Sequence, residues 1–151
     1  MKIQILTAIL STSIMVGITE AATINPVLPD STSLKWTTVT DMPEGAEAVI
    51  LSGNPTKEEP FVAWLKLPAG YTIPVHEHPI NEYDTVITGT YYLGSGEKIK
   101  LHQTQALPVG SFVKVPAKTW HYGWVKKETI IQISGVGPWG MIYPEKKEKP
   151  A

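Results

Sequence analysis

The chain has 151 residues, enough for one domain with a buried core and too few for two domains of ordinary size. Hydrophobic residues make up 42% and charged residues 18%, with 12 glycines and 13 prolines, which is typical of a folded, turn-rich protein. All 13 basic residues are lysines and the net charge is -1, so no arginine can read phosphates or base edges, and nucleic acid is not an expected partner. Cysteine is absent, which excludes disulfides, thiolate metal sites and cysteine nucleophiles.

The first 21 residues are typical of a secretory signal peptide. Lys2 precedes a mostly apolar stretch over residues 3–18, and small residues surround a cleavage point after Ala21. The alternative is a retained membrane anchor, but polar Thr and Ser residues shorten the apolar stretch below the ~20 residues that span a bilayer. We therefore expect an exported protein, periplasmic or secreted, with no stable membrane anchor after cleavage.

Residues 22–46 are rich in Pro, Ser and Thr and predict an extended N-terminal arm, which Trp36 would hold against the rest of the domain. Residues 47–143 contain short β-branched and aromatic runs separated by turn residues, which predicts an all-β barrel or sandwich. Residues 144–151 are a charged tail, expected to be flexible. The expected strands are 48–51, 61–67, 71–78, 83–88, 90–93, 98–102, 111–115, 120–125 and 129–134.

Two histidines and a glutamate lie close together in the middle of the chain. His76 and His78 share one face of a predicted strand, about 6.6 Å apart, and Glu77 between them points the other way. Pro79 favours a turn, after which Glu82 begins the next strand and can return its carboxylate beside the imidazoles. Taken alone, His76 and His78 are more often partly exposed strand residues than metal ligands. The prediction of a metal site therefore depends on all the candidate ligands together.

A third histidine, His121, lies 43 positions after His78, in a predicted strand where it shares a face with residues 123 and 125. If the fold brings that strand beside the first, three imidazoles and one carboxylate converge on one point. Such a site suits a divalent transition metal with positions left for water, dioxygen or substrate.

These residues resemble the two motifs of the cupin superfamily. The first motif is a glycine, five residues, His-x-His, three residues, Glu, six residues and a glycine, and the chain matches every defined position. The matching residues are Gly70, His76, His78, Glu82 and Gly89. The second motif is matched by Gly110, Pro116 and the ligand position His121.

The second motif has two departures. Lys118 replaces a turn glycine, which costs roughly 1 kcal/mol if the backbone there is left-handed. Val125 replaces an asparagine that is not a ligand. Neither change removes a ligand, but both affect the turn that presents His121.

The resemblance implies a cupin-type, jelly-roll-like β-barrel that binds one divalent transition metal, iron, manganese, nickel or zinc, at His76, His78, Glu82 and His121. It implies a metal-dependent enzyme acting on a small oxygenated molecule, by dioxygenase-like or isomerase-like chemistry, with Glu82 as ligand and, when detached, a general base. Two alternatives stay open: a non-catalytic cupin that senses or sequesters a small molecule or metal, and a metal that only stabilises the barrel.

Several notable residues outside the motifs are expected to have no catalytic role. His102 lies in an alternating polar run and is expected on the surface, without a role. Trp120, Tyr122 and Trp124 form a stripe on the face opposite His121, which we expect to be outer packing under the N-terminal arm, with a homodimer interface as the alternative. A final set is expected at the mouth of the barrel without a catalytic role: Tyr83, Tyr91, Gln132, Trp139 and Met141.

Overall fold

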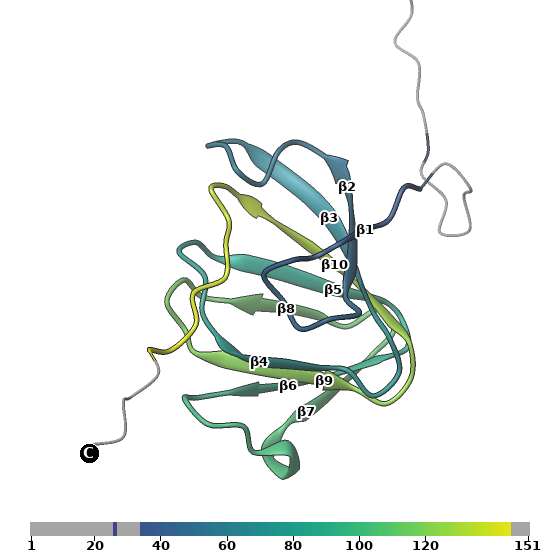
Figure 1. Ribbon diagram of the computed structural model, residues 1–151, viewed down its shortest axis with the longest axis vertical. Coiled ribbons are helices and arrows are strands. Elements are labelled where there is room, and N and C mark those ends of the chain that lie inside the picture. Colours follow the sequence, from purple (N-terminus) through teal and green to yellow (C-terminus); the bar gives the residue numbers. More distant parts are fainter. Residues whose placement is uncertain (1–25, 27–33, 146–151) are drawn as a thin grey trace, which may run out of the picture.

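The computed structural model describes Pro26 and residues 34–145, so the predicted signal peptide and most of the tail lie outside the described residues. The described part is almost entirely antiparallel β-structure in two facing sheets (Figure 1). This confirms the all-β fold class. No helix among these residues is long and apolar enough to cross a bilayer.

One sheet has six strands in the order β1-β2-β3-β10-β5-β8, and the other has four in the order β4-β9-β6-β7. The first sheet contains β1 (Thr37–Thr38), β2 (Glu47–Ser52), β3 (Pro60–Leu67), β10 (Thr129–Val136), β5 (Glu82–Thr88) and β8 (Phe112–Val115). The second contains β4 (Thr72–His76), β9 (His121–Val125), β6 (Thr90–Ser95) and β7 (Gln105–Pro108).

The core lies between the sheets and follows from the alternation of their strands. In β3, Phe61, Ala63, Leu65 and Leu67 all point inward and are buried. Residues that face them come from the other sheet, including Ile73 and Val125. This apolar layer surrounds the predicted ligands and keeps water from most of their surface.

The N-terminal arm is partly built into the barrel. Its described end forms β1, which pairs with β2, and Met42 and Ala46 are buried members of the core. The Lys66 ammonium of β3 lies 4.5 Å from the centre of the Trp36 ring, so Trp36 does contact the barrel. The assignment of residues 22–46 as an arm stays a prediction for the part outside the described residues.

The expected strands differ from the structure in several places. The stretch 98–102 is a loop that ends in a short 3-10 helix, η1 (Leu101–Gln103), because its alternating lysines reflect exposure on a loop and not a sheet face. The strand β7 was missed, since Gln105 and Pro108 are weak strand formers that an edge strand tolerates. The strand predicted over 71–78 ends at His76, and Glu77 makes only an isolated bridge to Ile142.

The chain leaves β10 and crosses one end of the two sheets, from the six-stranded sheet towards β4 (Figure 1). We call residues 137–143 of this segment the C-terminal strap. It is fixed by backbone hydrogen bonds from Gly137 to Glu59 and from Trp139 to Pro55, and by the Glu77–Ile142 bridge. The strap therefore covers the end of the barrel at which His76 lies.

Candidate metal centre

Three of the four predicted ligands meet at one point. His76 and His121 lie directly opposite each other in the β4–β9 pair, with ring centres 4.1 Å apart. His78 follows β4 on the connection to β5, and its ring lies 4.8 Å from that of His76. Potential ligand atoms of the three rings all lie within 4.8 Å of one another, and all three residues are buried.

Each histidine is held in the same tautomer by a backbone carbonyl. The Nδ1 atoms of His76, His78 and His121 donate hydrogen bonds of 2.7, 2.8 and 2.8 Å to carbonyl oxygens, which can only accept. Those oxygens belong to Pro74, Gly140 and Thr119. Each neutral ring therefore presents the Nε2 lone pair, the arrangement that metal-binding histidines use.

The Nε2 atom of His78 indicates whether the three histidines suit a metal ion. It is a buried polar atom without a hydrogen-bond partner, although it lies 3.3 Å from an Oε2 atom of Glu82. A buried nitrogen without a hydrogen-bond partner is costly unless something binds it, and a cation between the three imidazoles would do so. The residues thus fit a transition metal ion.

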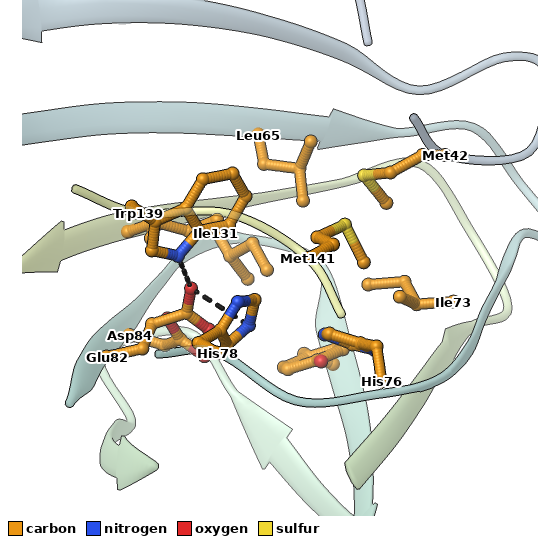
Figure 2. Close-up of a pocket in the computed structure, with 12 residues that line it drawn as sticks. Met42, Leu65, Ile73, His76, His78, Glu82, Asp84, Ile131, Trp139 and Met141 are labelled. Atoms are coloured by element: carbon orange, nitrogen blue, oxygen red, sulfur yellow. Dashed lines mark hydrogen bonds and ion pairs between the residues drawn. The ribbon is translucent and has the colours of Figure 1, made fainter. Parts of the chain in front are cut away.

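Glu82 begins β5 in the other sheet and lies beside the histidines (Figure 2). Its Oε2 accepts a 2.5 Å hydrogen bond from the indole Nε1 of Trp139. Among the described residues the tight cluster comprises only the three histidines, so the carboxylate lies next to it and not within it. A role for Glu82 as the fourth ligand stays a prediction.

Burial and mutual proximity change the protonation of these groups. Burial, with the neighbouring His121, lowers the pKa of His76 to about 3, and burial also lowers the pKa of His121. Burial opposes a charge on His78, but the adjacent Glu82 carboxylate outweighs it and raises the pKa of His78. For Glu82, burial is outweighed by His78 and Trp139, and its pKa is lowered. Metal binding requires the neutral form of His78, so it competes with the proton that the raised pKa of His78 favours.

Two further residues belong to the site that sequence reasoning left without a role. Asp84 is buried two positions after Glu82 on the same face of β5, and burial with the nearby Glu82 raises its pKa well above the ordinary value. The alternation of β5 could have identified it. Trp139, expected only at the barrel mouth, stacks on His78 at 5.0 Å and covers the cluster. Nothing local in the sequence marks that contact.

Of the other residues expected at the mouth of the barrel, two line the cavity beside the histidines and two lie elsewhere. Tyr91 and Met141 line the cavity beside the histidines, as expected. Gln132 instead accepts a hydrogen bond from Trp64, and Tyr83 stacks with Phe112 near the edge strand β8. His102 is exposed, as predicted.

The aromatic stripe opposite His121 is packing, and its cover differs from the expected one. Tyr122 is only 1% exposed, and its hydroxyl donates to the carbonyl of Lys100. Trp124 stacks on Tyr92 and donates to Thr104. The β6–β7 loop thus covers the stripe, and the N-terminal arm does not provide these contacts. A homodimer stays a prediction without support from Tyr122.

The family model described as "Domain of unknown function (DUF4437)" matches residues 21–138. The chain belongs to this DUF4437 family. No curated protein matches this DUF4437 member.

Solved structures show that its fold is that of the cupins. An RmlC-like cupin from Shewanella frigidimarina is 16% identical with a TM-score of 0.55, over 68% of this chain and 82% of that one. A putative acetylacetone dioxygenase from Methylibium petroleiphilum is 16% identical with a TM-score of 0.60, over 83% and 87%. The DMSP lyase DddQ from Ruegeria pomeroyi is 15% identical with a TM-score of 0.60, over 77% and 64%. The cupin resemblance is confirmed, and with the histidine cluster it indicates a divalent metal site.

Proposed function

We propose that this protein is an exported, metal-dependent enzyme that acts on a small oxygenated molecule. One divalent transition metal would be held by His76, His78 and His121, with Glu82 beside them as fourth ligand. The observation that carries the proposal is the common tautomer of the three buried histidines, whose Nε2 lone pairs are directed to one place.

A metal held there would supply Lewis acidity and, if redox-active, a means of reacting a substrate with dioxygen. The chain's own groups have separable tasks. The carbonyls of Pro74, Gly140 and Thr119 keep the imidazoles oriented. The lowered pKa of Glu82 favours its carboxylate form, which could accept a proton from a bound substrate. Trp139 excludes water from the site by stacking on His78.

The chemistry of the structural neighbours supports an enzyme. One neighbour is described as a putative acetylacetone dioxygenase and another as a DMSP lyase, and both act on small molecules by their names. The identities are too low to transfer either activity. Export rests on the N-terminal sequence alone, and a periplasmic or secreted location is part of the proposal.

The test begins with metal binding by the mature protein. Metal content is measured after purification from the native compartment, and zinc and cobalt are then titrated into chelator-treated protein. Wild type should bind about one equivalent, and His78→Ala should lower the affinity at least tenfold because it removes one of three imidazoles. His102→Ala, which changes an exposed histidine outside the site, is the matched control. Equal affinity in wild type and His78→Ala would contradict the metal centre.

Oxygen uptake or product formation is then screened with the metal found, using small diketones, hydroxy acids and sugars. Turnover should disappear in His121→Ala. Activity that survives in a metal-free variant would contradict the enzymatic proposal.

One observation favours a second candidate, a non-catalytic protein that captures a metal or small ligand. The cavity beside the histidines holds only about 20 Å³, room for about one water molecule, and Trp139 covers it. Tight metal binding without turnover across the metals and substrates screened would favour this candidate over the enzyme.

A further inference from the structure

The cavity beside His76 and His78, which we call the metal cavity, is too small for an organic substrate. Any such molecule therefore needs space elsewhere. The cavity's volume of about 20 Å³ accepts a water molecule or one donor atom of a ligand. A second cavity of about 70 Å³ lies next to it, on the inner side of β2 and β3. We call this second cavity the apolar chamber.

The apolar chamber adjoins the metal cavity through shared walls. Met42, Leu65, Ile133 and Trp139 line both spaces, so a single layer of side chains separates them. Figure 2 shows Met42 and Leu65 on the side of the metal cavity opposite His76 and His78. Methionine is unbranched and adapts its shape readily, which makes Met42 the side chain best suited to yield.

The lining of the apolar chamber defines what it can accept. All of its lining residues are apolar, apart from the indole groups of Trp64 and Trp139, whose N–H donors are already used by Gln132 and Glu82. A polar group placed there would lose its hydrogen bonds to water without replacement. An alkyl group would instead gain burial.

The volume sets the length of that group. A protein cavity of roughly 150 Å³ lined by apolar residues binds benzene, with six carbons, so about 70 Å³ suits about three carbons. Ile50 lines the chamber and is 47% exposed, so the wall of the chamber at β2 borders solvent. Interiors are otherwise packed with few voids larger than water.

We propose that the substrate or ligand has an oxygen-donor head, such as a carboxylate, that reaches the histidine cluster, and an unbranched alkyl tail of about three carbons that occupies the apolar chamber. This inference rests on the proposed metal centre and specifies its substrate class. Met42 and Trp139 form the passage between head and tail.

A different cleft also touches the cluster and provides the competing route. It holds about 230 Å³ between β6 and β8 and is lined by His121, Thr119 and the exposed Lys114, among others. A ligand that entered there would depend on Lys114 and would be insensitive to the apolar chamber.

The experiment measures binding of straight-chain carboxylates, from acetate to hexanoate, to the cobalt-loaded full chain through changes in cobalt absorption. Affinity should rise about fourfold per methylene group and level off near butanoate, whose tail of three carbons fills the chamber. Cobalt uptake is recorded first. Absence of uptake overturns the metal centre itself, whereas uptake with equal affinity for all acids overturns only the apolar chamber as a tail site.

Two variants test the location of the tail. Ala63→Leu fills the chamber from β3 and should move the plateau to shorter acids. Ile50→Gln changes a half-exposed residue in the wall at β2, which is tolerated by folding, and should reduce the gain per methylene group to below twofold even if Ala63→Leu fails to fold. Lys114→Ala is the control and should leave the series unchanged. If Lys114→Ala changes the affinities across the series of acids and Ile50→Gln does not, the acids bind in the competing cleft and the inference is overturned.

Discussion

Lys118 has a backbone conformation that is unusual for its residue type. Its φ angle is 58°, in the left-handed region, at the position where the cupin motif has glycine. The same residue donates its backbone N–H to the carbonyl of His78, at 2.9 Å. The turn that the departure put in question is therefore formed, and it supports a metal-site histidine at a cost in backbone strain.

Replacing Lys118 with glycine should stabilise the protein. Lys118→Gly keeps the N–H that binds His78 and removes the Cβ strain, so the free energy of unfolding should rise by about 1 kcal/mol. Chemical denaturation measures it. Lys114→Gly, in a strand with ordinary backbone angles, is the control and should destabilise by about 0.5–1 kcal/mol. A destabilised Lys118→Gly would contradict the strain argument.

At the level of single residues, the sequence predicted the local part of the site well. His76, His78 and Glu82 lie within seven positions, at the end of β4, on the short connection after it and at the start of β5, so their proximity follows from the local chain path although His78 lies outside the strand expected for it. His121 required the second motif, because its pairing with His76 is a tertiary contact. The contacts of Trp139 could not be predicted from the sequence, because the C-terminal strap has no periodic pattern and its path depends on the folded barrel.

The strands β6 and β9 meet through two glycine–tyrosine contacts. A Cβ atom on Gly94 would lie 2.4 Å from the Tyr122 ring, and one on Gly123 would lie 2.3 Å from the Tyr91 ring. Both tyrosines are buried and cannot move aside easily. These glycines let large aromatic rings lie flat against the neighbouring strand, which fixes the strand that carries His121.

The variant Gly94→Ala should therefore be strongly destabilising. The added methyl group overpacks the Tyr122 ring, and we expect a loss of about 2–3 kcal/mol, measured by chemical denaturation. Gly140→Ala provides the comparison, because a Cβ atom there would meet no atom within 4 Å. Similar losses for both variants would mean that close packing at Gly94 is not the cause.

Among the elements, long alternating strands were predictable and irregular segments were not. The strands β3, β5 and β10 combine β-branched residues with a clear inner face, so their positions were close to those expected. The loop 98–102 imitates that alternation without a partner strand, and β7 lacks strand-forming residues. Pairing in the finished sheet decides such cases, and single-sequence patterns carry little information about it.

For the whole molecule, the buried histidines link stability to pH. In the unfolded chain His76 binds a proton below about pH 6.5. In the folded protein the pKa of His76 is about 3. Between these values the unfolded state binds more protons, so the contribution of His76 to stability is lost as the pH falls from 6.5 towards 3. His121 acts in the same direction, whereas the raised pKa of His78 acts in the opposite one.

A comparison of variants isolates this effect in metal-free protein. The free energy of unfolding of wild type relative to His76→Gln should decrease by roughly 2–3 kcal/mol between pH 7.5 and pH 4.5. Chemical denaturation with a chelator present measures it at both values. His102→Gln, which changes an exposed histidine outside the cluster, is measured in parallel. A constant difference for His76→Gln would show that its burial has no effect on its protonation.

The stacking of Trp139 on His78 has an optical consequence for the molecule. The centre of the indole ring lies 5.0 Å from that of an imidazole of the cluster, so an ion bound by that imidazole would lie close to the indole and, if paramagnetic, would quench its fluorescence. The protein thus contains its own fluorophore next to the proposed metal position. Emission from that ring would report occupancy by copper or cobalt directly, without any added dye.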